Sequence, residues 1–238
     1  MRETLLVLAG GFGTRLRALV SDVPKPLAPV EGIPFLQYLI LNWKRQGIKS
    51  IALLIHYESE KIKNLVLSMD AAGLLAGVEV RVVVENSPLG TGGSVFNALN
   101  DLNIKDNFLV ANADTWLSGG LQSVADAGPY SIGAKKVCDV GRYGALDIKD
   151  GNVKAFDEKL GGSRPGWINA GIYHLNADIF AKYKLGDSFS LEKTVLPDIV
   201  KSQQLRVVKL DADFIDIGVP KDYLTFCDWV KKGRVNEI

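Results

Sequence analysis

A glycine-rich stretch with one cationic side chain directly follows an apolar run near the N-terminus. The apolar run covers residues 4–9, and the stretch Gly10–Arg15 reads GGFGTR. Glycines let backbone N–H groups come close to a ligand, and α/β sheets bind ligands at the carboxyl ends of their parallel strands. Because such N–H groups and an arginine bind phosphate oxygens, the pattern indicates phosphate binding; a tight turn without a ligand is the alternative.

Two better-known glycine loops do not fit this stretch. A dinucleotide fingerprint that begins at Gly11 requires glycine at position 16, which is Leu16. A P-loop that begins at Gly10 requires glycine at position 15, which is Arg15. The stretch therefore belongs to neither class.

A single lysine lies between prolines shortly after this loop. The segment 24–29 reads PKPLAP, and Lys25 is its only cation. Proline fixes its own φ and restricts the residue before it, so the backbone around Lys25 is stiff. A cation held in this way suits charge neutralisation at a phosphate, whereas a solvated loop lysine is the alternative.

Two carboxylates occupy positions where burial is costly. Asp114 ends an otherwise apolar run, and Asp216 lies inside the sequence FIDIG at 214–218. A buried carboxylate requires an ionic partner, hydrogen bonds or a metal ion, and Mg²⁺ accepts carboxylate oxygens. A Mg²⁺ ion between two such carboxylates fits this requirement, while an aspartate that only forms a turn is the alternative. Their separation along the chain leaves open whether they meet.

The elements that must position these residues alternate between strand and helix patterns in the first half of the chain. Strand-like runs cover 4–9, 50–56, 78–86 and 108–111, and helix-period stretches cover 34–46, 58–69 and 92–102. Closely spaced strands follow at 131–137, 145–148, 153–158 and 168–175, before a helix near 191–201, a strand at 205–210 and a helix at 220–232. This order predicts an α/β fold, a Rossmann-like three-layer α/β/α structure with a mostly parallel mixed central sheet and a small antiparallel β insertion.

Length and composition indicate one ordinary globular domain over residues 1–238, since 47% of the residues are hydrophobic and 23% are charged. The net charge of +1 lacks the basic excess of non-specific nucleic-acid binders, so no nucleic-acid partner is expected. No apolar run approaches the roughly 18 residues of a membrane span, so no membrane partner is expected either. Two widely separated cysteines and an N-terminus without a long apolar stretch favour the cytoplasm.

The motifs together resemble the signature of the sugar-phosphate nucleotidylyltransferases, also called nucleotide-sugar pyrophosphorylases. That signature, GGxGTRL followed by PKP, is matched at 10–16 and 24–26. Further similar stretches follow in the family's order through nearly the whole chain, at Glu85–Gly93, Asn112–Asp114, Tyr143–Gly144, Glu158–Lys159, Asn169–Gly171 and Phe214–Pro220. Ala113 is a departure, because many relatives have glycine before the aspartate.

The resemblance implies a GT-A-like fold in which residues 1–130 mainly bind the nucleotide and residues 131–238 mainly bind the sugar phosphate. It implies attack by a sugar 1-phosphate oxygen on the α-phosphorus of a nucleoside triphosphate, with release of pyrophosphate and with Mg²⁺ as cofactor. By the same resemblance, the catalytic cations are Arg15 and Lys25, and the metal ligands are Asp114 and Asp216.

Two further sets of residues follow from this resemblance. Those that would bind the nucleotide are Leu8, Ala9, Gly10, Gly11, Gly13, Thr14, Glu85, Pro88, Gly90 and Thr91. Those that would bind the sugar phosphate are Tyr143, Gly144, Glu158, Lys159 and Asn169.

Within the family, the chain resembles the branch that transfers GMP from GTP to a heptose 1-phosphate, over 142–144, 158–159, 169–173 and 214–223. Glu85 adds a chemical reason for GTP, because a carboxylate accepts hydrogen bonds from both guanine N1–H and the exocyclic amine, whereas uracil or thymine offers one donor. GDP-heptose synthesis for capsule or another surface polysaccharide is therefore expected. The alternatives are mannose 1-phosphate with GTP, glucose 1-phosphate with UTP or dTTP, and a non-catalytic sensor of nucleotide sugars. Whether the protein forms a homodimer stays open.

Overall fold

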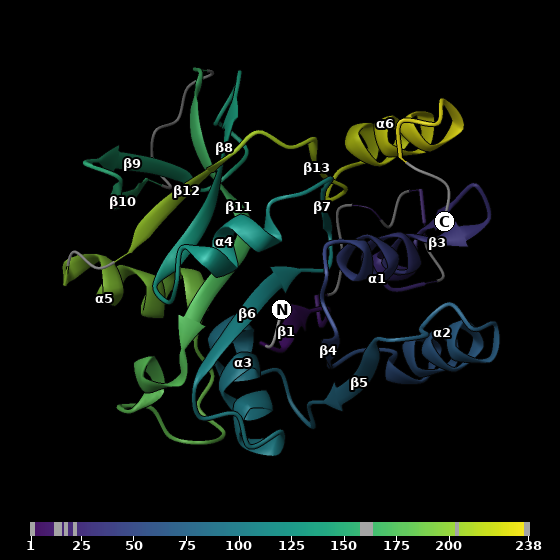
Figure 1. Ribbon diagram of the computed structural model, residues 1–238, viewed down its shortest axis with the longest axis horizontal. Helices are drawn as coiled ribbons and strands as arrows, with labels where there is room; N and C mark the ends of the chain where they lie inside the picture. Colours follow the sequence, from purple (N-terminus) through teal and green to yellow (C-terminus); the bar gives the residue numbers. More distant parts are fainter. Residues whose placement is uncertain are drawn as a thin grey trace.

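A nine-stranded mixed sheet runs through the protein (Figure 1). The computed structural model describes residues 3–11, 16, 19–20, 23–157, 164–202 and 205–235. The strand order in the sheet is β5-β4-β1-β6-β11-β8-β12-β10-β9. These strands are β1 (Leu5–Leu8), β4 (Ser50–Ile55), β5 (Glu79–Val84), β6 (Asn107–Asn112), β8 (Ser131–Val137), β9 (Ala145–Lys149), β10 (Asn152–Asp157), β11 (Gly166–Asn176) and β12 (Arg206–Leu210).

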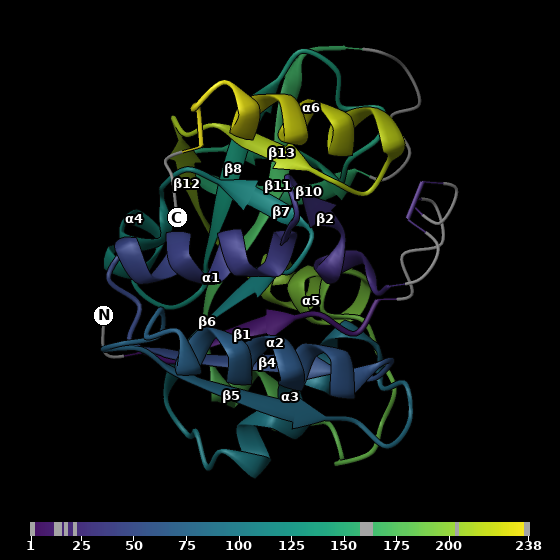
Figure 2. The same cartoon turned by 90° about the vertical axis from the view of Figure 1, so that its right-hand side faces the viewer.

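Helices cover both faces of this sheet. One layer holds α1 (Phe35–Arg45), α2 (Ser59–Ala71), α4 (Leu121–Asp126) and α6 (Pro220–Lys231), and the other holds α3 (Gly90–Asp101) and α5 (Leu196–Lys201). Figure 2 shows α1, α2 and α6 on the side that faces the viewer. Within the described ranges, no helix is long and apolar enough to cross a membrane.

Alternation along β1 shows why two layers form. Leu5 and Val7 pack into one hydrophobic core, and Leu6 packs into the other, because successive side chains of a strand point to opposite faces. A strand covered on both faces must be apolar at every position, which explains the continuous run LLVL. The expected three-layer α/β/α class is confirmed.

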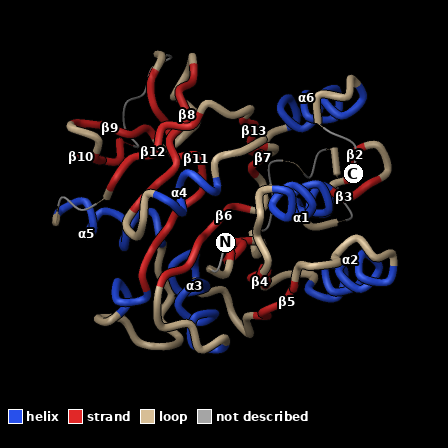
Figure 3. The backbone as a smooth tube through the Cα atoms, in the orientation of Figure 1, coloured by secondary structure: helices blue, strands red, loops and turns tan. Residues whose placement is uncertain are grey.

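The first half of the sheet is parallel throughout. β1 pairs in parallel with β4 and β6, and β4 pairs in parallel with β5. The chain returns through α1, α2 and α3 between these strands, as a parallel connection requires. The expected strand–helix alternation is confirmed, and Figure 3 shows it along the backbone.

The second half of the sheet is mostly antiparallel. The long strand β11 runs antiparallel to β6 and β8, β12 runs parallel to β8, and β9 and β10 form a hairpin at the edge. The expected antiparallel strands therefore extend the central sheet. A register shift between Asn169 and Tyr173 makes a bulge in β11, and Gly171 inside it has a φ of +73°. Glycine suits this position because its φ is left-handed.

Several short elements complete the chain. They are η1 (Lys25–Leu27), η2 (Ala177–Phe180), the hairpin of β2 (Pro29–Val30) with β3 (Ile33–Pro34), and the antiparallel pair of β7 (Thr115–Leu117) with β13 (Phe214–Asp216). The helix expected near 191–201 divides into a π-helical turn, η3 (Leu191–Val195), and α5. Pro197 explains the division, since it lies in the first turn of α5 and has no N–H to continue a helical ladder.

Helix α6 buries two aromatic residues in the core, Tyr223 and Phe226, and Phe226 contacts three other rings. Phe226 is fully buried, with its ring centroid 4.9 Å from that of Phe35, 5.8 Å from Tyr38 and 5.3 Å from Trp116. Aromatic pairs at such separations add to the gain from burial alone. Phe226 therefore joins α6 to α1 and to β7, the strand that directly follows Asp114.

Replacing Phe226 by alanine should lower the free energy of unfolding by about 3–5 kcal/mol, because the mutation removes a buried ring and leaves a cavity. Leu224→Ala is the matched control on the same helix, since Leu224 is 56% exposed, and it should change that free energy by less than about 0.5 kcal/mol. Urea unfolding followed by circular dichroism measures both. Equal losses in the two variants would contradict the anchoring role of Phe226.

Candidate active site

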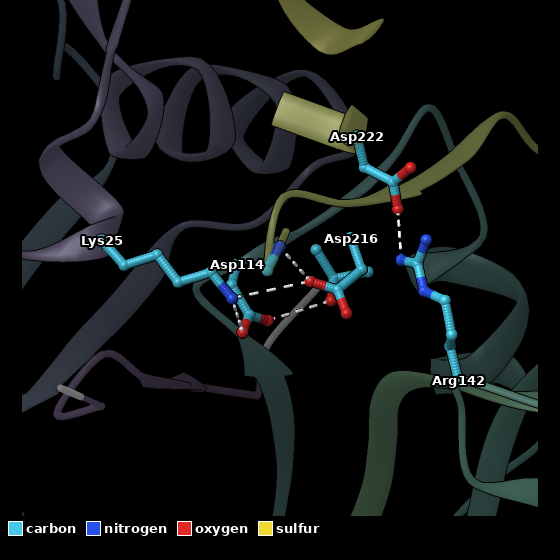
Figure 4. Close-up of polar contacts among 7 residues, drawn as sticks. Lys25, Asp114, Arg142, Asp216 and Asp222 are labelled. Atoms are coloured by element: carbon cyan, nitrogen blue, oxygen red, sulfur yellow. Dashed lines mark hydrogen bonds and ion pairs between the residues drawn. The ribbon is translucent and has the colours of Figure 1, made fainter. Parts of the chain in front are cut away.

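The ammonium group of Lys25 lies between the carboxylates of Asp114 and Asp216 (Figure 4). Its Nζ atom is 2.6 Å from Asp114 Oδ2 and 3.6 Å from Asp216 Oδ1. The Lys25 side chain is 11% exposed, whereas those of Asp114 and Asp216 are 36% and 27% exposed. A nearly buried cation is thus held against two carboxylates that still reach solvent. These three residues are far apart in the sequence but form one cluster in the structure.

Three separate elements bring these side chains together. Lys25 begins η1, whose next two residues are buried and fix the turn. Asp114 follows β6, and Asp216 ends β13. The N–H of Ile217 donates to the carbonyl oxygen of Asp114 at 2.9 Å, so the two aspartate-bearing segments are bonded directly to each other. The cluster therefore depends on the pairing of β7 with β13.

Neighbouring groups fix both aspartates. The hydroxyl of Thr115 donates to Asp114 Oδ1 at 3.1 Å, and the N–H of Gly218 donates to Asp216 Oδ1 at 2.7 Å. A Cβ atom on Gly218 would lie 2.8 Å from Asp216 Oδ1 and 3.0 Å from Lys25 Nζ. Only glycine lets the backbone come this close to the cluster.

The two carboxylates suit a magnesium ion whose coordination is completed by substrate. In phosphate-transfer sites, Mg²⁺ is held by one or two carboxylates, and phosphate oxygens and waters complete the octahedron. Asp114 and Asp216 approach the same ammonium group, so both carboxylates face one point in the site. In the part of the chain that the structure describes, no group of three or more His, Cys, Asp or Glu side chains could hold a metal. Two carboxylates fit a Mg²⁺ ion whose other ligands are phosphate oxygens and waters.

A cavity of about 370 Å³ opens beside Asp114. It lies where β1, β4, β5 and β6 end and where α3 begins, which is the edge at which parallel sheets bind ligands. The expected nucleotide-binding residues that line it are Leu8, Gly10, Gly11, Glu85, Pro88, Gly90 and Thr91. Ala9 is instead buried in the core, where its N–H donates to the carbonyl oxygen of Leu54 at 3.0 Å.

Five of the expected site residues, Gly13, Thr14, Arg15, Glu158 and Lys159, lie outside the described residues. The cavity also has lining residues that were not expected, namely His56, Leu89, Ser94, Asn112 and Glu192. Asn112 and His56 end or follow strands, so their position at the carboxyl edge of the sheet was a usable signal.

Glu85 is buried at the β5 end of the cavity. The hydroxyl of Ser94 donates to its Oε1 atom, and the N–H of Leu89 donates to its Oε2 atom at 3.3 Å. Both donors come from the segment that enters α3, so Glu85 fixes this segment. A carboxylate has about four acceptor positions, and Glu85 therefore keeps acceptors for a ligand.

The glycines at the start of α3 let a second segment pack closely against this helix. The N–H groups of Gly92 and Gly93 donate to the carbonyl oxygen of Phe189 at 2.9 and 3.3 Å. A Cβ atom on Gly90 would lie 2.6 Å from that same oxygen, and one on Gly93 would lie closer still to the carbonyl oxygen of Asp187. These glycines therefore hold one wall of the cavity together.

Glu192 is the residue that this packing brings into the cavity. Its Oε2 atom accepts hydrogen bonds from the hydroxyls of Thr91 at 2.6 Å and Ser190 at 2.9 Å. The N–H of Leu191 donates to Thr91 Oγ1 at 2.8 Å. Ser190 was a signal for the start of a helical turn, but nothing in the sequence indicated that Glu192 would face α3.

Of the expected sugar-binding residues, the three that the structure describes, Tyr143, Gly144 and Asn169, lie in the second half of the sheet. The N–H of Asn169 donates to the carbonyl oxygen of Gly144 at 2.9 Å, which joins β11 to the turn before β9. The Asn169 amide donates to the hydroxyl of Tyr173 at 2.7 Å and accepts from the N–H of Gly171 at 3.0 Å. The bulge in β11 therefore fixes the Asn169 side chain.

Tyr143 precedes Gly144 in the chain and contacts Phe214 of β13. Its ring packs edge-on against Phe214, with centroids 5.7 Å apart. Burial raises the pKa of Tyr143; the positive charge of Arg142 opposes this, and the carboxylates of Asp222 and Asp216 raise the pKa further. The phenol is therefore protonated at neutral pH and available as a hydrogen-bond donor close to Asp216.

Solved structures of similar fold belong to the nucleotidyltransferase class. A crystal structure of HddC from Yersinia pseudotuberculosis, complexed with GMP-PN, superposes with a TM-score of 0.83 and 34% identity, covering 96% of this chain and 99% of that chain. The family model described as nucleotidyl transferase matches residues 4–232. The chain therefore belongs to the nucleotidyl transferase family, as the motifs predict.

Two curated relatives share a narrower name. D-glycero-alpha-D-manno-heptose 1-phosphate guanylyltransferase of Campylobacter jejuni is 35% identical over 223 residues, covering 93% of this chain and 97% of the relative. The protein of that name from Aneurinibacillus thermoaerophilus is 33% identical over 223 residues, covering 92% and 94%. The similarity extends over nearly the full length of both relatives.

Replacing Gly93 by alanine should destabilise the protein by about 1–3 kcal/mol, because the added methyl group meets backbone atoms that cannot move freely. At an exposed glycine inside a helix, the same substitution would instead stabilise the protein by about 1 kcal/mol. GTP affinity should fall as well, since the displaced segment carries Glu192. Thermal unfolding and titration calorimetry with GTP measure the two effects.

Gly119→Ala is the control for this prediction, because a Cβ atom there meets no heavy atom within 4 Å. It should leave both measurements unchanged. A Gly93→Ala protein as stable as the wild type would contradict the prediction, because it would show that the segment with Asp187 can move away from the added methyl group.

Proposed function

We propose that this protein transfers GMP from GTP to D-glycero-α-D-manno-heptose 1-phosphate and releases pyrophosphate. The observation that carries the proposal is the cluster of Lys25, Asp114 and Asp216 at the edge of a ligand-sized cavity. The names of the relatives described above support the choice of base and sugar. The product, GDP-heptose, would supply the synthesis of capsule or of another surface polysaccharide.

The shape of the cavity gives the nucleotide a direction. Glu85 follows β5 at one end, Gly10 and Gly11 follow β1, and Asp114 follows β6 at the other end. Three strand spacings of about 4.8 Å separate β5 from β6, so the cavity spans roughly 14 Å. The base then lies at Glu85, and the phosphates lie at Asp114.

Glu85 would read the guanine edge. Guanine presents two adjacent donors, N1–H and the exocyclic amine, to a carboxylate that keeps free acceptor positions beside the bonds from Ser94 and Leu89. Uracil and thymine present one donor. A buried carboxylate left partly unsatisfied by a pyrimidine costs free energy, so the site favours GTP.

The reaction joins two anions. An oxygen of the sugar 1-phosphate attacks the α-phosphorus of GTP, the bond from that phosphorus to the bridging oxygen breaks, and pyrophosphate leaves. A phosphate monoester carries about −1.5 to −2 charges near pH 7, so charge must be neutralised before the reactants can meet. Lys25 would neutralise charge at the α-phosphate, and its low exposure strengthens this interaction because little water screens it.

Asp114 and Asp216 would hold Mg²⁺ in this reaction. The bound ion would supply Lewis-acid stabilisation of phosphate oxygens. The protein's own contribution is to fix the two carboxylates, through the hydroxyl of Thr115 and the N–H of Gly218, before the substrate arrives.

The assay that tests the proposal measures pyrophosphate release in the presence of Mg²⁺. Each of GTP, UTP, dTTP, ATP and CTP is combined with heptose, mannose or glucose 1-phosphate. Release should be fastest with GTP and the heptose phosphate. Activity with another pair would keep the reaction class and overturn the substrate, whereas a folded protein that binds nucleotide without release would be a nucleotide-sugar sensor.

Lys25→Met in the same assay should reduce kcat by about 10²–10³-fold, as expected for the loss of one preorganised electrostatic group. Lys63→Met is the control, because Lys63 forms an exposed ion pair with Glu60 on α2. Comparable melting temperatures for the two variants would show that the loss is catalytic. An unchanged kcat in Lys25→Met would remove Lys25 from the mechanism.

Asp216→Asn should raise the Mg²⁺ concentration needed for half-maximal activity by at least about tenfold, because an amide oxygen binds Mg²⁺ less strongly than a carboxylate. Asp211→Asn, at an exposed position just before β13, is the control and should leave the metal response unchanged. Titration of activity with MgCl₂ at saturating substrates measures this. Identical metal curves for all three proteins would show that Asp216 is not a ligand.

A further inference from the structure

We infer that Arg142 binds the phosphate of the sugar 1-phosphate and that Asp222 positions its guanidinium group. Neither residue was expected to act in the site. The inference rests on the proposed function, because it assigns a residue to the acceptor substrate of that reaction.

The contacts of Arg142 hold its side chain in one place. Its Nη2 atom donates to Asp222 Oδ2 in the first turn of α6. Its guanidinium lies over the ring of Tyr143, with Cζ 5.3 Å from the ring centroid. That ring packs against Phe214, two residues before Asp216 on the same strand. The guanidinium is therefore fixed beside β13.

This position is next to Asp216 and on the side away from Lys25. Figure 4 shows Asp216 between Lys25 and Arg142. The hydrogen bond with Asp222 raises the pKa of Arg142, and the charges of Asp222 and Asp216 add to this rise, which agrees with the proximity. Arg142 is therefore charged and lies at the border of the aspartate cluster.

Arg142 keeps donors for a ligand. A guanidinium has five N–H groups, and Asp222 is its hydrogen-bond partner within the described ranges. The Arg142 side chain is 43% exposed, while that of Asp222 is 16% exposed. The planar group therefore has one edge held by the protein and another edge open to solvent. Arginine in this arrangement can bind a phosphate through two parallel hydrogen bonds.

The acceptor substrate is the anion that this position fits. The nucleotide cavity lies at the ends of β1, β4, β5 and β6, and its lining includes Asp114 but not Arg142. Arg142 instead follows β8, beside Tyr143 and Gly144, on the side where the sugar phosphate is expected. In-line attack also requires the acceptor to approach the α-phosphorus opposite the leaving pyrophosphate. A cation there neutralises the incoming phosphate without stabilising bound pyrophosphate.

Asp222 has a distinct role in this proposal. It does not touch substrate, and its carboxylate holds one edge of the guanidinium, so that the group stays beside β13 with its other donors available. Without this partner a long arginine side chain would sample many rotamers, and ordering it would lower the affinity for the acceptor. Asp222 is therefore a positioning residue.

A second arginine in the chain provides a matched control. Arg234 pairs with Asp213 and lies over Trp229, with Cζ 4.0 Å from the ring centroid. It thus forms the same kind of Arg–Asp–aromatic contact just after the other end of α6. If Arg142 only fastened α6, the loss of either arginine would have the same consequences.

The experiment measures KM for both substrates, kcat and melting temperature in Arg142→Ala, Arg142→Lys, Asp222→Asn and Arg234→Ala. Arg142→Ala should raise KM for the sugar 1-phosphate about ten- to hundredfold, as expected when charged hydrogen bonds are lost, and leave KM for GTP unchanged. Arg142→Lys should recover part of this loss, and Asp222→Asn should show a smaller rise in the same KM. Arg234→Ala should change neither KM. Guanidinium chloride at millimolar concentration should restore activity to Arg142→Ala.

Two outcomes would overturn the inference while the proposed function stands. The first is an active Arg142→Ala enzyme whose KM for the sugar phosphate matches the wild type. The second is a parallel change of both KM values in Arg142→Ala and Arg234→Ala, which would make both pairs structural. If the wild type releases no pyrophosphate with any pair, the proposed function fails, and calorimetric titration of heptose 1-phosphate into wild type and Arg142→Ala still decides whether Arg142 binds it.

Discussion

The attraction of two aspartates to one lysine is the interaction on which the site depends. Lys25 is nearly buried, and an ammonium group in that position is stable only because Asp114 and Asp216 approach it. The carboxylates in turn would repel each other without that cation. Elements from the start, the middle and the end of the chain must therefore be held together at this point. The packing of Phe226 and the pairing of β7 with β13 supply that restraint.

Close approach of backbones is the second constraint, and glycine meets it in two places. At Gly218 any side chain would collide with the aspartate and the lysine. At Gly90 and Gly93 any side chain would collide with the segment that carries Glu192 into the cavity. In both places glycine is required because it has no side chain. This role differs from the phosphate binding that a glycine-rich motif first suggests.

The two halves of the sheet contribute different parts of the proposed site. The parallel half ends in the cavity that would take the nucleotide, because parallel strands present all their carboxyl ends on one edge. The antiparallel half contributes the bulge at Gly171, the side chains of Asn169 and Tyr143, and the cation of Arg142. The aspartate cluster lies where the halves meet, so that both anionic substrates of the proposed reaction can reach the same pair of carboxylates.

The sequence by itself determined the local elements, the family and most of the residues that line the cavity. A helix expected at 34–46 forms at Phe35–Arg45, and a strand expected at 131–137 forms at Ser131–Val137, because hydrophobic periodicity is a local property. Only the tertiary structure decided that Asp114 and Asp216 meet at Lys25, that the antiparallel strands extend the central sheet, that Glu192 lines the cavity, and that Arg142 pairs with Asp222. These features join segments far apart in the chain through hydrogen bonds and packing, and no local pattern of residue types encodes which distant partner a strand or side chain will find.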